Sequence, residues 1–178
     1  MLSRRVPNYS VDLTKSSFDR ANAWLDSIRD IPDYDRFDAP ISLRSSLRLI
    51  SASGPDPSSP ASSTSVATTT FEFKVTHQLC NGGGTLHGGA VALIFDMCTS
   101  ITIACAAGEG FWNTAHVSRT LNCTYLRPLP EGEDAIIESE VVHLGKAMGL
   151  TRGVIKRKKD GAVCYTCEHG KASLSSKL

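Results

Sequence analysis

The sequence feature that most constrains the fold is a long apolar run, Ala90–Ala107, which directly follows a glycine-rich segment. The junction reads NGGGTLHGGAVALIFD and carries one carboxylate, Asp96, inside the apolar run. The run is nearly long enough to cross a bilayer, but a charge and several hydroxyl side chains interrupt it. It therefore predicts a buried helix rather than a membrane span, and the GEG at 108–110 ends it.

The other regular segments are short. Six of them alternate apolar and polar residues with the period of strands, at 41–53, 66–75, 114–126, 134–144, 148–158 and 162–174. Turn residues separate the last four, which predicts that neighbouring strands form antiparallel hairpins. Upstream of them, Phe18, Ala21, Leu25 and Ile28 form one apolar stripe of a helix that Ser16 or Ser17 caps.

An apolar helix beside one antiparallel sheet is buried only if the sheet curls around it. We therefore expect an α+β fold in which a curved antiparallel sheet of about six strands wraps a long central helix. We expect three parts: an arm with an amphipathic helix at 1–40, the main domain at 41–174 with a flexible Ser/Pro-rich insertion at 54–65, and a tail at 175–178. Because one sheet covers one helix incompletely, association into a dimer is expected.

Composition excludes several classes of function. The net charge of +1 over 178 residues gives no reason to expect nucleic-acid binding. The six cysteines lie among apolar neighbours and no secretory signal precedes them, so we interpret them as reduced core residues. Cys164 and Cys167 form a CxxC on a strand, where residues three apart point to opposite faces. We expect neither a metal site nor a cofactor.

The last three residues are Ser176, Lys177 and Leu178. A terminal S-K-L is an address that the peroxisomal import receptor reads, and the polar residues before it would present it. We therefore expect a peroxisomal protein. A cytoplasmic or mitochondrial location is the alternative.

The glycine segment has three possible uses. Gly88 and Gly89 at a helix start would expose backbone N–H groups, which can bind an oxyanion. A phosphate cradle and a purely structural turn are the alternatives, although the spacing matches neither the P-loop nor the dinucleotide motif. Asp96 likewise is either a general base, a structural hydrogen-bond acceptor or a residue of the solvent-facing edge.

The set formed by Asn81, GTLHGG, Asp96 and HVSRTLNCTYLRP resembles the hotdog-fold thioesterases. The most similar branch is the phenylacetic-acid-degradation type, which includes thioesterase superfamily member 2. The resemblance implies hydrolysis of acyl-CoA thioesters to a free acid and coenzyme A. Asn81 and the Gly88 N–H would polarise the carbonyl, Asp96 would act as base on water or as nucleophile, and Ser118 would position the water.

The resemblance also implies supporting and binding roles. His87 and Gly89 would support the glycine turn. Coenzyme A is part of the substrate, and the residues expected to bind it are Tyr125, His143, Leu144, Gly145, Lys146, Ala147 and Met148. The basic run at 156–159 is either a solvated hairpin tip or a part of the 3′-phosphate site. Members of the family form homodimers, often paired into homotetramers, with active sites at the dimer interface.

Two other functions remain open at the level of sequence. One is a hotdog hydratase or dehydratase, which would pair a histidine with a carboxylate. The other is an acyl-CoA-binding module without catalysis. The acyl group cannot be read from the sequence, although Met97, Phe111 or Trp112 would be placed to set the depth of its pocket.

Overall fold

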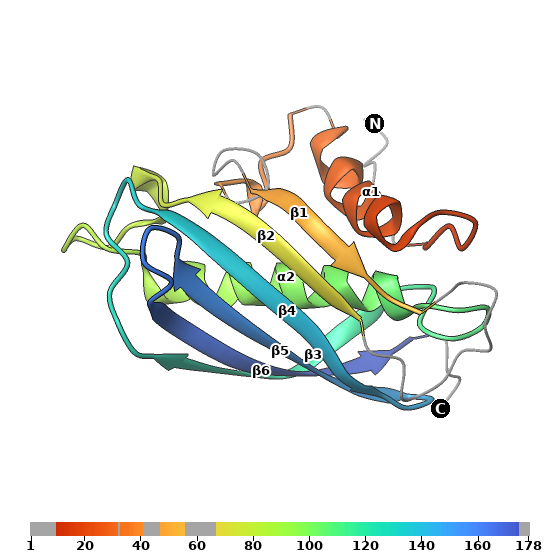
Figure 1. Ribbon diagram of the computed structural model, residues 1–178. Coiled ribbons are helices and arrows are strands. Elements are labelled where there is room, and N and C mark those ends of the chain that lie inside the picture. Colours follow the sequence, from red (N-terminus) through yellow and green to blue (C-terminus); the bar gives the residue numbers. More distant parts are fainter. Residues whose placement is uncertain (1–9, 32, 41–46, 56–66, 175–178) are drawn as a thin grey trace.

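The computed structural model describes residues 10–31, 33–40, 47–55 and 67–174, and in it one antiparallel sheet curls around one long helix (Figure 1). The helices are α1 (Ser17–Arg29) and α2 (Gly88–Ala106), with a short 3-10 turn at His77–Leu79. The strands are β1 (Arg48–Ser53), β2 (Thr68–Lys74), β3 (His116–Tyr125), β4 (Asp134–Leu144), β5 (Met148–Arg157) and β6 (Val163–Ser173). This confirms the expected α+β architecture.

Helix α2 is the core of the molecule. Its central and C-terminal turns are buried almost without interruption from Met97 to Ala106. By length and composition it is the one helix in the described ranges that could cross a membrane, yet 72% of the relevant window is buried inside the protein. The sheet thus provides the apolar surroundings that its composition demands.

The sheet order is β1-β2-β4-β5-β6-β3, with every neighbouring pair antiparallel. The expected hairpins β1–β2, β4–β5 and β5–β6 are confirmed. The expected hairpin between β3 and β4 is wrong, because β3 pairs with β6 and lies at the far edge. The reason is the connection at 126–133: it runs past the start of α2, where the Leu86 N–H donates to the Leu129 carbonyl and the Leu129 side chain is buried.

Close packing of α2 on the sheet depends on Gly153 in β5. A Cβ at this position would lie 2.7 Å from Cδ1 of Phe95 and 3.0 Å from Sγ of Cys167. Both neighbours are buried, so they have little room to move. A side chain at 153 would therefore push α2 away from the sheet at the turn that precedes Asp96.

Helix α1 packs on the other side of α2 and beside β1 (Figure 1). The Ser16 hydroxyl caps it by accepting from the Asp19 N–H, as expected. Ala21, Leu25 and Ile28 are buried, but Phe18 is 39% exposed, so its place on the buried stripe was wrongly predicted.

Buried Arg20 anchors α1 instead of Phe18. Its guanidinium donates to the carbonyl oxygens of Leu13, Lys15 and Ala107. An apolar-stripe argument misses such a residue, because burial of the charged group depends on carbonyl acceptors in other segments, two before α1 and one at the end of α2.

The proposed domain boundaries stay a prediction. Residues 1–9, most of the 54–65 insertion and the tail at 175–178 lie outside the described residues. All six cysteines are free, and within the described ranges no group of His, Cys, Asp and Glu side chains could hold a metal ion.

Candidate active site

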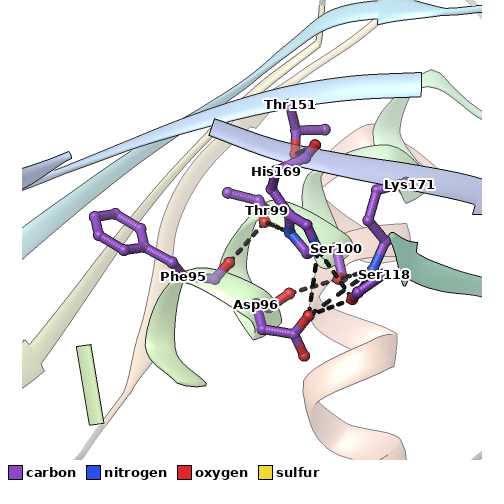
Figure 2. A network of polar contacts seen from close by, with 8 residues as sticks. All are labelled: Phe95, Asp96, Thr99, Ser100, Ser118, Thr151, His169 and Lys171. Atoms are coloured by element: carbon purple, nitrogen blue, oxygen red, sulfur yellow. Dashed lines mark hydrogen bonds and ion pairs between the residues drawn. The ribbon is translucent and has the colours of Figure 1, made fainter. Parts of the chain in front are cut away.

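The candidate site centres on Asp96, which projects from the middle of α2 toward β3 and β6 (Figure 2). The Ser118 hydroxyl, from β3, donates to Asp96 Oδ1 at 2.6 Å. This is the length of a charge-assisted O–H···O⁻ bond. The sequence placed these two residues in one site, and the structure brings their side chains together.

Two residues that the sequence analysis did not include complete this cluster: His169 and Lys171, both on β6. His169 Nε2 lies 2.9 Å from Ser118 Oγ and 3.4 Å from Asp96 Oδ1. Lys171 Nζ donates to Ser118 Oγ at 3.0 Å and lies 4.0 Å from Asp96 Oδ1. A signal was available, because Cys167, His169 and Lys171 alternate along a strand and so share its buried face.

A second row of contacts fixes the cluster to the helix. Thr99 Oγ1 donates to the Phe95 carbonyl at 2.6 Å and lies 2.7 Å from His169 Nδ1. The Ser100 hydroxyl donates to the Asp96 carbonyl and accepts from Lys171 Nζ at 2.8 Å. Thr99 and Ser100 therefore connect α2 to β6 through side chains, which holds Asp96 in register with the strand.

Burial controls the electrostatics of the cluster. It lowers the pKa of Lys171 from 10.5 to about 8, although nearby Asp96 favours the charged form. Burial, followed by the charge of Lys171, lowers the pKa of His169 well below its ordinary value. At neutral pH the cluster therefore holds a neutral imidazole and an ammonium group beside the carboxylate.

Asp96 and Ser118 open into a cavity of about 730 Å³. Its apolar wall includes Trp24, Leu93, Met97, Trp112, Val117 and Leu174. The Asp96 side chain is 42% exposed, and its contacts with the described residues all use Oδ1, which leaves Oδ2 facing outward. Of the three residues expected to set pocket depth, Met97 and Trp112 line this cavity, whereas Phe111 does not.

The glycine turn lies at the N-terminal end of α2. Gly88 is the first residue of the helix, so its N–H has no acceptor within the helix. His87 caps the helix by accepting the Gly89 N–H on Nδ1 at 2.9 Å, which agrees with a supporting role. Of the glycines before His87, Gly84 has a φ of +71°, a conformation that requires glycine, whereas a Cβ at Gly82 would meet nothing.

Asn81 folds back onto its own turn. Its Oδ1 accepts from the Gly83 N–H at 2.9 Å, and its amide group donates to Thr85 Oγ1 at 3.1 Å. These contacts fix the direction of the amide and leave its second N–H for another acceptor. The turn is thus a preorganised pair of donors, one from Asn81 and one from the Gly88 backbone.

Within one chain these donors are far from Asp96. Gly88 and Asp96 are eight residues apart on one helix, which is about 12 Å at 1.5 Å per residue. A single carbonyl group cannot lie within hydrogen-bond distance of both. The residues that the sequence assigned to one site therefore form two separate clusters within the chain.

The residues expected to bind coenzyme A are also divided. Tyr125 lies over the start of α2, where its hydroxyl donates to the Gly88 carbonyl at 2.9 Å and its ring packs edge-on against Tyr165. The turn at 143–148 lies at the other end of the helix, where Trp112 Nε1 donates to the Gly145 carbonyl. Within this turn the Leu144 side chain is buried in the core, so only its backbone is available to a ligand.

The basic run at 156–159 is fully paired. Lys156, Lys158 and Lys159 contact Glu138, Glu72 and Glu133, and Arg157 contacts Asp160. This favours the interpretation as a solvated hairpin tip.

A long helix wrapped by one curved antiparallel sheet is the hotdog fold, and in this protein a carboxylate at the middle of the helix opens into a cavity. Comparison with known proteins gives the family. The family model described as Thioesterase superfamily matches residues 83–164. Human acyl-coenzyme A thioesterase 13 is 31% identical over 100 residues, which are 56% of this chain and 69% of the human protein.

Solved structures agree with this assignment. Zebrafish thioesterase superfamily member 2 superposes with a TM-score of 0.70 at 25% identity, covering 89% of this chain and 99% of that chain. The Escherichia coli PaaI protein from the phenylacetic acid degradation operon shares the fold, with a TM-score of 0.56, 20% identity, and 71% and 82% of the two chains covered. The chain belongs to the thioesterase superfamily and is a thioester hydrolase.

Proposed function

We propose that the protein hydrolyses acyl-CoA thioesters, with Asp96 as the general base that activates water. The observation that carries this proposal is the Ser118–Asp96 hydrogen bond of 2.6 Å at the wall of the cavity. Because that bond holds Oδ1, Oδ2 is free to accept a proton from a water molecule in the cavity. Acyl-CoA is the substrate named for the human relative, and the apolar wall of the cavity suits an acyl group.

In the proposed reaction the water oxygen attacks the thioester carbonyl while Asp96 Oδ2 takes the water proton. The carbonyl oxygen becomes an oxyanion, which accepts hydrogen bonds from the Gly88 N–H and the Asn81 amide. When the intermediate collapses, the C–S bond breaks and the proton passes from Asp96 to the leaving thiolate. The products are a carboxylic acid and free coenzyme A.

The oxyanion donors must come from a second copy of the chain, because Gly88 lies about 12 Å from Asp96 along α2. Strand β3 is the free edge of the sheet, and antiparallel pairing with β3 of a second copy would extend it. Ser118 is near the start of β3, and Tyr125, which contacts Gly88, is at its end. Two-fold pairing would therefore bring Asp96 of each copy toward the Gly88 turn of the other.

The direct test is thiol release from a panel of acyl-CoA substrates of increasing chain length, together with one aryl-CoA. We expect thioester hydrolysis by the wild-type protein and none above background by Asp96→Asn. Tight binding without thiol release by the wild-type protein would instead indicate a binding module. Light scattering of the same preparation separates a monomer from a dimer or from the expected homotetramer.

The hydratase alternative requires a histidine that reaches the substrate beside a carboxylate. His87 is occupied as the helix cap, and His169 is fully buried with Nδ1 against Thr99. Neither of these two histidines is therefore placed for proton transfer to an enoyl group, and a third histidine, His116, lines the cavity with its Nδ1 buried. Incubation with an enoyl-CoA, with hydration and free thiol followed together, distinguishes the two reactions.

A further inference from the structure

Lys171 is a buried ammonium group that the proposed chemistry does not use. The residue is only 3% exposed, and it lies on the strand that faces the middle of α2. Burial of a lysine is costly unless its charge is compensated. Its two hydrogen-bond partners, Ser100 and Ser118, are neutral hydroxyls, and the compensating charge is Asp96 at 4.0 Å (Figure 2).

The chemistry of the ammonium group sets the direction of the hydrogen bonds around Ser118. An ammonium group only donates, so Ser118 Oγ must accept from Lys171. A carboxylate only accepts, so the single Ser118 proton must point to Asp96 Oδ1 at 2.6 Å. The order of donation is therefore Lys171 to Ser118 to Asp96.

His169 offers the Ser118 proton a competing acceptor. Thr99 Oγ1 donates to the Phe95 carbonyl at 2.6 Å, so it accepts from His169 Nδ1–H at 2.7 Å. Because this imidazole is neutral, Nε2 is left as an acceptor only 2.9 Å from Ser118 Oγ. The charge on Lys171 favours donation to Asp96, because donation from an ammonium group polarises the hydroxyl and a cation stabilises a nearby carboxylate.

We propose that Lys171 is a positioning residue for hydrolysis: through Ser118, its ammonium group fixes Asp96 Oδ1 and keeps Oδ2 directed at the attacking water. This inference rests on the proposed function of Asp96. The ionisable groups that interact with Lys171 are Asp96 from α2, His169 from β6 and His116 from β3, and Arg36 and Asp38 also line the cavity that Lys171 borders. Both histidines are neutral at pH 7, because burial lowers their pKa values, so Asp96 is the one anion that acts directly on Lys171.

The proposal predicts that kcat falls at alkaline pH, which gives the pH–rate profile an alkaline limb. Lys171 is charged below a pKa of about 8, so kcat should be highest below that pH and fall as pH rises through it. The substitution Lys171→Arg keeps a cation at every accessible pH, and its alkaline limb should move above pH 10. The substitution Lys171→Met is charge-free and of similar length. It should lower kcat about tenfold or more, with KM within about threefold of wild type and no limb near pH 8.

Three comparisons make the test specific. Lys74→Met removes an exposed lysine at the C-terminal end of β2 and should leave both kcat and its pH profile unchanged. Because Lys171 acts through Ser118, Lys171→Met should change kcat less than twofold in a Ser118→Ala background. Melting temperatures identify any variant that does not fold. If Lys171→Met does not fold, the pH profiles of kcat for the wild-type protein and for Lys171→Arg still test the proposal.

The proposal is overturned if wild-type kcat is flat between pH 7 and 10. It is also overturned if Lys171→Arg leaves the limb near pH 8, or if Lys171→Met and Ser118→Ala act additively. These outcomes are separate from failure of the proposed function, which would appear as hydrolysis by Asp96→Asn at the wild-type rate.

Discussion

Ser118 and Asp96 are 22 residues apart in the sequence, yet the Ser118 hydroxyl donates to Asp96 Oδ1 at 2.6 Å across the gap between β3 and α2. The contact brings the proposed base and its proposed orienting group together at the wall of a cavity. We expect Asp96→Asn to lower kcat by about 10²- to 10⁴-fold, the usual contribution of a general base. KM should change little, because the amide keeps the shape of the carboxyl group. Steady-state thiol release measures both values, and a large rise in KM with kcat preserved would contradict the role.

Ser118→Ala should be less severe. It removes one hydrogen bond to a charged group, which contributes about 1.5–3 kcal/mol, so kcat should fall about 10- to 100-fold. Ser53→Ala is a matched control, since that hydroxyl pairs with Thr68 on the far edge of the sheet. Equal losses in both variants would show a general effect on stability.

Sites shared between two copies predict complementation. Asn81→Ala and Asp96→Asn should each be inactive alone, whereas a mixed dimer of the two keeps one intact site. Random mixing should then restore about one quarter of the wild-type activity, since half of the dimers are mixed and each has one of two sites.

The matched control for complementation is a mixture of Asp96→Asn with Ser118→Ala. Because Asp96 and Ser118 meet within one chain, this mixture should gain nothing beyond the residual activity of Ser118→Ala. Co-expression with two affinity tags allows the mixed species to be purified and assayed. Purified mixed dimers of Asn81→Ala and Asp96→Asn that remain inactive would place the site within one chain.

Stability should fall on acidification. Burial lowers the pKa of His116 from 6.5 to about 4, and its Nδ1 has no partner among the described residues. The unfolded chain therefore binds a proton first, so stability is full above about pH 6.5 and decreases as pH falls toward 4, by up to about 3 kcal/mol. His116→Gln should reduce the dependence of melting temperature on pH between 7.5 and 4.5, and the remaining dependence should include the contribution of buried His169. His77→Gln, at an exposed position, should not.

We propose that Ser176–Leu178 directs the protein to peroxisomes, since a terminal S-K-L is read by the import receptor. A fluorescent protein fused upstream of the chain should co-localise with a peroxisomal marker. Removal of the three residues should leave it diffuse. Unchanged import after the deletion would assign targeting to another segment.

Much of this fold is predictable from local pattern. The run after Gly89 specifies α2, and alternating residues specify the strands, because burial of one face imposes the period. The position of β3 in the sheet cannot be predicted from local pattern. It depends on residues 126–133, which pair with the glycine turn and do not close a hairpin between β3 and β4. Phe18 is more exposed than its place on the apolar stripe predicted, and Arg20 is buried for a similar reason, since the carbonyl acceptors of Arg20 lie in other segments.

The candidate site, like the fold, is only partly predictable from the sequence. Asp96 and Ser118 could be assigned from motifs, and they meet. His169 and Lys171 lie in no recognised motif, and a polar residue on a strand is ordinarily interpreted as solvent-facing. Their alternation with Cys167 places them on one face of β6, but the three-dimensional arrangement is needed to show that this face packs against Thr99 and Ser100 of the helix.

The close approach of Phe95 to Gly153 affects how the sequence of such a protein can evolve. Phe95 is the residue before Asp96, and its carbonyl accepts from Thr99. A methyl group added at 153 would meet the Phe95 ring at 2.7 Å, on the side of the helix away from the cavity. A substitution at position 153, which does not line the cavity at Asp96, would thus act on the proposed base indirectly, through Phe95 and the helix.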